Sequence, residues 1–93
     1  ENDWQGAHDL WQSLFEQTKS KKLKIKSAFN LALASEMQGD LLQAEKWLKE
    51  VEKRVTAGSD EDVIRKFYAE QLAERMKQFP HLNTQMSRFG NNF

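Results

Sequence analysis

A glycine–aspartate pair near the middle of the chain, Gly39-Asp40, interrupts a long stretch of helix-forming residues. Glycine readily takes the left-handed backbone conformation that ends an α-helix. Aspartate accepts hydrogen bonds from the backbone N–H groups that begin one. Apolar residues on both sides of the pair recur at spacings of three and four, as on one face of a helix. The segment from Ala28 to Val51 therefore predicts two antiparallel helices joined by a tight turn.

The residues around this turn resemble one tetratricopeptide repeat, a unit of about 34 residues built from two packed helices. The resemblance rests on Asn30-Leu31-Ala32, on the Gly39-Asp40 turn, and on Ala44 and Leu48 in the second helix. Small residues at such positions let two helix axes approach closely. Placing the turn on the family's turn assigns the repeat to residues 24–57.

The chain departs from the family pattern at three positions. Ala28 stands where a large aromatic residue is usual, Val51 stands where a second alanine is usual, and the closing proline is missing near Thr56. The resemblance nevertheless implies a helical repeat fold, in which the first helices of successive repeats line a concave groove.

The first helix that we expect, residues 3–18, repeats the pattern of the second helix of this repeat. Asn2 or Asp3 supplies its N-terminal cap, in the place of Gly39-Asp40. Its apolar residues have the same spacing as Leu41, Ala44, Leu48 and Val51, and they are Trp4, Ala7, Trp11 and Leu14. We therefore expect the chain to be the C-terminal piece of a longer repeat protein.

A further helix is predicted at residues 59–79, after a stop at Thr56-Ala57-Gly58. Ser59 and Asp62 have the spacing of a capping box, and Pro80 disfavours helical geometry at Phe79. We interpret this helix as a cap that closes the stack. Its expected buried face comprises Ile64, Phe67, Tyr68, Leu72 and Met76.

The sequence thus predicts an all-α fold, a tetratricopeptide-like α-solenoid fragment of about four antiparallel helices with a C-terminal capping helix. Residues 1–79 form the helical domain and residues 80–93 a tail. Trp47 lies off the inner stripe of its helix, which predicts contact with the last helix or the tail. The residues expected to be most buried are Trp4, Trp11, Leu31, Ala44 and Leu48.

Charge and composition exclude several function classes. The 14 basic residues balance the 14 acidic ones, whereas a general nucleic-acid binder normally shows a basic surplus. The chain has no cysteine and no apolar run of the ~20 residues that a membrane span needs. Five lysines crowd residues 19–26. A solvated connection is the favoured interpretation of this cluster, and a phosphate or acidic-lipid patch is the alternative.

No catalytic, cofactor or metal motif is present. His8 and His81 are the two histidines, and neither has partners at metal-ligand spacing. There is no Gly-x-Ser-x-Gly elbow and no glycine-rich phosphate loop. We therefore expect no enzymatic activity and no cofactor, and a carbohydrate-handling domain or enzyme is the least favoured hypothesis.

The favoured function is a non-catalytic protein–protein interaction or scaffold module. In the family pattern, the groove side is formed by the first of the two helices in the repeat at residues 24–57. Its groove residues correspond to Lys26, Phe29, Asn30, Leu33, Glu36 and Met37. A competing interpretation makes Phe29 and Leu33 core residues covered by neighbouring helices. The alternative function is a structural end-cap or a homo-oligomerisation domain.

A second resemblance, to the C-terminal end of Gram-negative envelope lipoproteins with tetratricopeptide repeats, covers most of the chain. It implies a location in the cell envelope, and a cytoplasmic location stays open. Open apolar surface predicts weak self-association as a symmetric dimer. The residues expected to mediate it are Leu10 and Phe15 in the first helix, or Met86, Phe89 and Phe93 in the tail.

Overall fold

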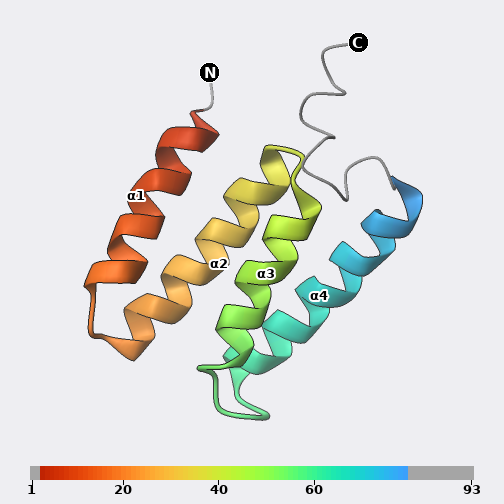
Figure 1. Cartoon of the computed structure of the whole chain (residues 1–93). Helices are drawn as coiled ribbons and strands as arrows, with labels where there is room; N and C mark the ends of the chain where they lie inside the picture. The colour runs from red at the N-terminus through yellow and green to blue at the C-terminus, as the bar shows by residue number, and fades with distance from the viewer. Residues whose placement is uncertain (1–2, 80–93) are drawn as a thin grey trace.

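The computed structural model describes residues 3–79, and within this range every regular element is a helix. The four helices are α1 (Trp4–Gln17), α2 (Lys21–Met37), α3 (Leu41–Glu52) and α4 (Asp60–Gln78). They lie side by side in chain order, each antiparallel to its neighbour (Figure 1). The predicted all-α class with four helices is confirmed. The predicted tail, residues 80–93, lies outside the described residues.

Each helix begins at a residue whose side chain accepts a backbone N–H three positions further on. This contact satisfies one of the donors that the first turn of a helix leaves unpaired. Asp40 and Ser59 cap as the sequence predicts, and Asp3 rather than Asn2 is the first cap. Ser20 is a cap that the sequence analysis did not identify. The four bonds join Asp3 to Gly6, Ser20 to Leu23, Asp40 to Gln43, and Ser59 to Asp62.

The turn between α2 and α3 is a Schellman motif centred on Gly39. The N–H of Asp40 donates to the carbonyl of Ser35, and the N–H of Gly39 donates to the carbonyl of Glu36, both at 2.9 Å. Gly39 has a φ of 82°. This backbone conformation is unfavourable for a residue that has a β-carbon. The predicted positive φ at Gly39 is therefore confirmed.

We expect Gly39→Val to destabilise the protein by ~1 kcal/mol or more, because a β-branched residue strains the left-handed region. Urea unfolding followed by circular dichroism measures the change. Gly39→Asn is the matched control, since asparagine tolerates this conformation better than valine does. Equal stability of the valine variant and the wild type would contradict the assignment of the turn.

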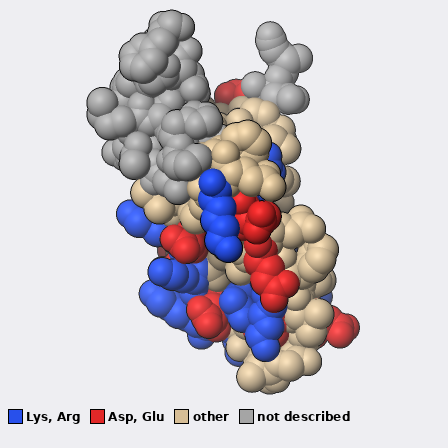
Figure 2. Space-filling view, turned by 90° about the vertical axis from the view of Figure 1, so that its right-hand side faces the viewer, with Lys and Arg blue, Asp and Glu red and all other residues tan. Residues whose placement is uncertain are grey.

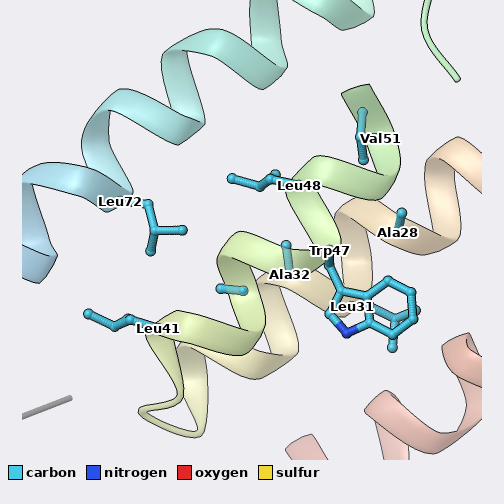
Figure 3. Close-up of a cluster of buried hydrophobic side chains, with 9 residues drawn as sticks. Ala28, Leu31, Ala32, Leu41, Trp47, Leu48, Val51 and Leu72 are labelled. Atoms are coloured by element: carbon cyan, nitrogen blue, oxygen red, sulfur yellow. The ribbon is translucent and has the colours of Figure 1, made fainter. Parts of the chain in front are cut away.

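The hydrophobic core lies on both sides of α2, which is covered by α1 on one side and α3 on the other. Trp47 and Leu31 lie toward α1, whereas Leu72 extends from α4 toward Leu41 and Leu48 (Figure 3). The buried cluster consists of Ala28, Leu31, Ala32, Leu41, Ala44, Trp47, Leu48, Val51 and Leu72. Leu31, Ala44 and Leu48 are buried as predicted.

Two serines of α2 are buried beside this cluster without a hydrogen-bond partner for their hydroxyl groups. Ser27 is 0% exposed and Ser35 is 1% exposed. A buried hydroxyl that loses its bonds to water costs free energy, and alanine forms helix better than serine. We therefore expect Ser35→Ala to raise the free energy of unfolding by about 1 kcal/mol. Urea unfolding tests this, with Ser13→Ala on the exposed surface of α1 as the control.

Among residues 3–79, α1 is covered on one side only, by α2 and the side chain of Trp47, and it has no fully buried residue. Trp4 and Trp11 are partly buried and neither belongs to the fully buried cluster, so they are less deeply buried than Leu31, Ala44 and Leu48. Trp47 contacts α1 instead of α4. Its ring lies edge-on to Phe15, with the ring centroids 5.2 Å apart. Phe15 therefore packs against the core, so its predicted place on open surface is wrong. Leu10 is 74% exposed, as the sequence predicts.

The predicted buried face of α4 is correct at Tyr68, Leu72 and Met76, which pack on the core, and wrong at its first two residues. Leu72 is buried, but Ile64 is 57% and Phe67 is 61% exposed. The side chains of Asp62 and Arg65 occupy the packed side instead, 6% and 12% exposed. They form an ion pair with a 3.0 Å N···O distance. This pairing offsets part of the free-energy cost of burying the two charged groups, while Ile64 and Phe67 stay exposed.

Candidate functional site

A groove of about 880 Å³ lies where α2, the α3–α4 connection and the beginning of α4 meet. We call it the α2–α4 groove. Successive antiparallel helices place the N-termini of α2 and α4 at the same end of the molecule (Figure 1), and the α3–α4 connection lies beside them. The lining residues are Lys21, Lys22, Ile25, Lys26, Phe29, Asn30, Arg54, Val55, Thr56, Ser59, Glu61 and Ile64.

The groove combines apolar side chains with basic ones. Ile25 and Phe29 lie four residues apart on α2, and therefore on one face of that helix. Val55 and Ile64 add apolar surface from the other two elements. A concave surface with apolar walls and a few polar groups is the usual form of a binding site. The arrangement can hold extended or helical polypeptide, but it provides no nucleophile with an adjacent base.

Arg54 belongs to the lining, but its charge is already partly neutralised. Its guanidinium donates to a carboxylate oxygen of Glu50 at 2.8 Å and lies 4.9 Å from the centre of the Phe15 ring. The hydrogen bond from Arg54, assisted by Lys53, lowers the pKa of Glu50. Arg54 therefore fixes the end of α3 against α1 more than it attracts a ligand.

Lys24, alone among the lysines at residues 21–26, points away from the groove. Its ammonium group donates to the backbone carbonyl of Phe15 and lies 4.7 Å from the centre of that ring. The lysine cluster is thus divided, since Lys21, Lys22 and Lys26 line the groove while Lys24 holds α1 to α2.

The α3–α4 connection is fixed by Asp62. Its carboxylate accepts the N–H of Gly58 at 2.9 Å and the guanidinium of Arg65 at 3.0 Å. The bond from Gly58, followed by the bond from Arg65, lowers the pKa of Asp62. Gly58 has a φ of 82°, so this contact holds a tight turn directly beside the groove residue Ser59.

We expect the stability that Asp62 contributes to depend on pH. A carboxyl whose pKa is lowered by folding stabilises the native state above its unfolded pKa. This contribution disappears as the pH falls through the folded pKa. Between about pH 5 and pH 2, the free energy of unfolding should therefore fall less in Asp62→Asn than in the wild type. Urea unfolding at several pH values measures the difference, and equal slopes would contradict the prediction.

Three of the six predicted groove residues line the α2–α4 groove, namely Lys26, Phe29 and Asn30. The amide of Asn30 donates to the carbonyl of Lys26 at 3.1 Å, which orients this side chain along α2. Leu33 and Met37 are exposed, at 39% and 54%, but are not among the lining residues. The structure thus places these two residues on α2 beyond the groove, and a binding role for each remains a prediction.

Glu36, the sixth predicted residue, joins α2 to α4. Its carboxylate accepts the hydroxyl of Tyr68 at 2.8 Å and pairs with Arg75. Burial of Tyr68, followed by its bond to Glu36, raises the pKa of the phenol well above the usual range. The hydroxyl therefore stays a hydrogen-bond donor. We call the interactions of Glu36 with Tyr68 and Arg75 the Glu36 contact. They engage the carboxylate of Glu36 within the fold.

The sequence analysis missed the wall formed by the α3–α4 connection and α4. These residues are Val55, Thr56, Ser59, Glu61 and Ile64. One signal points to them. In an antiparallel succession, the stop at Gly58 must lie at the same end of the molecule as the start of α2. The cluster of lysines and this loop are therefore expected at the same end of any up-and-down arrangement of these helices.

A smaller hollow of about 130 Å³ lies between α3 and α4, and its lining residues are Glu45, Leu48, Lys49, Glu52, Arg65, Ala69, Leu72, Ala73 and Met76. On the side of the molecule that includes α4, acidic and basic side chains are interspersed (Figure 2). Residues 3–79 contain no group of three or more histidine, aspartate or glutamate side chains suited to hold a metal ion. Within the same range, no helix has the length and the apolar character that crossing a membrane requires.

Comparison with known proteins identifies a family for this chain. The family model described as "Domain of unknown function (DUF6340)" matches residues 1–74. No curated protein and no solved structure matches the chain. The matched range includes α1, α2, α3, most of α4 and every lining residue of the α2–α4 groove. Since the match covers well over half of the sequence, the chain belongs to the DUF6340 family.

Proposed function

We propose that this chain is a non-catalytic interaction module that binds a segment of another protein in the α2–α4 groove. The observation that carries the proposal is the groove itself, about 880 Å³ in volume and lined by apolar side chains from α2, the α3–α4 connection and α4. Large exposed apolar residues that lie together usually mark an interaction surface. Ile64 lines the groove, and Val63 and Phe67 are two further exposed apolar residues of α4, 58% and 61% exposed.

The helix arrangement supports a tetratricopeptide-like repeat as the framework of this module. In the family pattern, the first helices of consecutive repeats line the groove, and we propose that α2 and α4 correspond to these positions. Helix α1 repeats the apolar spacing of α3, as expected if it is the second helix of a preceding unit. We therefore propose that the groove is the concave surface of a helical repeat array, in which the chain serves as a scaffold.

Selection from a library of random 12-residue peptides displayed on phage tests the proposal. We expect peptides to enrich on the immobilised chain and to shift the backbone amide resonances of Phe29, Asn30 and Ile64. Ile64→Asp should abolish binding without unfolding the protein, because this side chain is more than half exposed. Leu10→Asp is the matched control, as Leu10 is an exposed apolar residue on α1.

Two outcomes would contradict the proposal. One is a selection in which no sequence enriches over an unrelated helical protein. The other is enrichment of peptides whose resonance shifts fall outside the groove and whose binding survives Ile64→Asp.

A further inference from the structure

We infer that the α2–α4 groove selects an acidic polypeptide segment that also carries large apolar side chains. The inference rests on the proposed function and names the chemical class of the partner. It starts from the distribution of charge. The chain is neutral overall, yet residues 17–35 contain five lysines and no aspartate or glutamate. This stretch includes most of α2, so the α2 wall of the groove is basic.

Three of these lysines remain available to a ligand. Lys21, Lys22 and Lys26 line the groove and are exposed. None of them has a carboxylate within 4.0 Å among the described residues, whereas Lys53 and Lys66 are paired. Glu61 is the single acidic residue among the lining residues. The groove therefore presents an excess of positive charge that the fold itself does not neutralise.

The positions of the basic and apolar residues define what the partner must offer. Lys22 and Lys26 are four residues apart on α2, as are Ile25 and Phe29, so the two pairs form adjacent rows along the helix. One helical turn rises about 5.4 Å. A complementary segment must then place apolar side chains against Ile25 and Phe29, and carboxylates beside them against the lysine row. A purely polar polyanion would leave the apolar row uncovered.

The apolar row also distinguishes a polypeptide from a nucleic acid. Base recognition on a single strand uses aromatic rings interleaved with basic residues, and Phe29 is the single aromatic side chain of the lining. The chain's own tail, residues 80–93, contains no aspartate or glutamate. It therefore lacks the charge that the lysine row requires. A segment of another protein fits both rows.

The composition of the selected peptides tests this inference. From the random 12-residue library, the wild-type chain should enrich peptides rich in aspartate and glutamate that contain leucine, phenylalanine or tryptophan. The double variant Lys22→Glu, Lys26→Glu should bind those peptides about tenfold more weakly, and its own selection should favour lysine and arginine. The variant Lys46→Glu, Lys77→Glu makes the same change of net charge on other exposed surface and should behave like the wild type.

Each other result has a defined meaning. Peptides that bind at Phe29 and Ile64 without acidic enrichment would overturn this inference while supporting the proposed function. A selection with no enriched peptide would overturn both. Groove resonances that shift with a single-stranded oligothymidylate but not with any acidic peptide would overturn the inference in favour of a nucleic acid. Circular dichroism of the variants confirms that their helices are intact.

Discussion

Trp47→Ala should destabilise the protein by about 3–5 kcal/mol, the range found for removing a large buried aromatic side chain. Trp47 is 9% exposed and belongs to the core cluster. It is also the side chain through which α3 reaches α1, since its ring lies against Phe15 and 6.3 Å from His8. An edge-on aromatic pair adds about 0.5–1.5 kcal/mol to the area that the rings bury.

Trp47→Phe provides the control for this prediction. The indole N–H of Trp47 is buried and has no hydrogen-bond partner, so a phenyl ring removes volume without breaking a hydrogen bond. We expect the phenylalanine variant to lose less than half of the stability that the alanine variant loses. Urea unfolding followed by circular dichroism measures both. Equal losses would contradict the prediction, because they would show that a phenyl ring at this position packs no better than the methyl group of alanine.

Leu72→Ala should destabilise the protein by about 2–5 kcal/mol, since it leaves a cavity in a well-packed site. Leu72 is 2% exposed and is the one fully buried apolar side chain that α4 contributes. The effect should fall first on α4, because the remaining apolar contacts of α4 come from half-buried residues such as Ala69 and Met76. We expect limited trypsin digestion to cleave the variant within α4 before it cleaves α2.

Val63→Ala is the matched control on the same helix. Val63 is 58% exposed, and a surface substitution of this kind usually changes stability by less than about 0.5 kcal/mol. If Leu72→Ala and Val63→Ala gave the same stability and the same digestion pattern, α4 would not be held by the contact that the structure shows.

The features that depend on neighbouring residues were predictable from the sequence. The positive φ of Gly39 and the caps at Asp40 and Ser59 follow from backbone preferences that operate within one turn of helix. The existence of four helices follows from the spacing of apolar residues between those signals. The family resemblance named Lys26, Phe29 and Asn30, which line the α2 wall of the groove, but not Lys21, Lys22 and Ile25 beside them.

The features that depend on distant partners were not predictable. Nothing near Glu36 indicates that Tyr68, 32 residues away, donates to its carboxylate. Likewise, the apolar spacing of α4 favours a buried Ile64. The structure buries the ion pair of Asp62 and Arg65 instead, a choice that pattern alone cannot make, because burial of a charge depends on whether its partner is also buried.

The two walls of the α2–α4 groove are joined mainly by contacts outside the groove. Leu72 and the Glu36 contact lie toward the other half of α4 from Ile64. A segment bound to both walls would therefore be thermodynamically linked to the position of α4. Each tenfold rise in the concentration of free ligand above the Kd would stabilise the packed state of α4 by about 1.4 kcal/mol. Binding would then be visible as slower amide hydrogen exchange throughout α4, including in turns that the ligand does not touch.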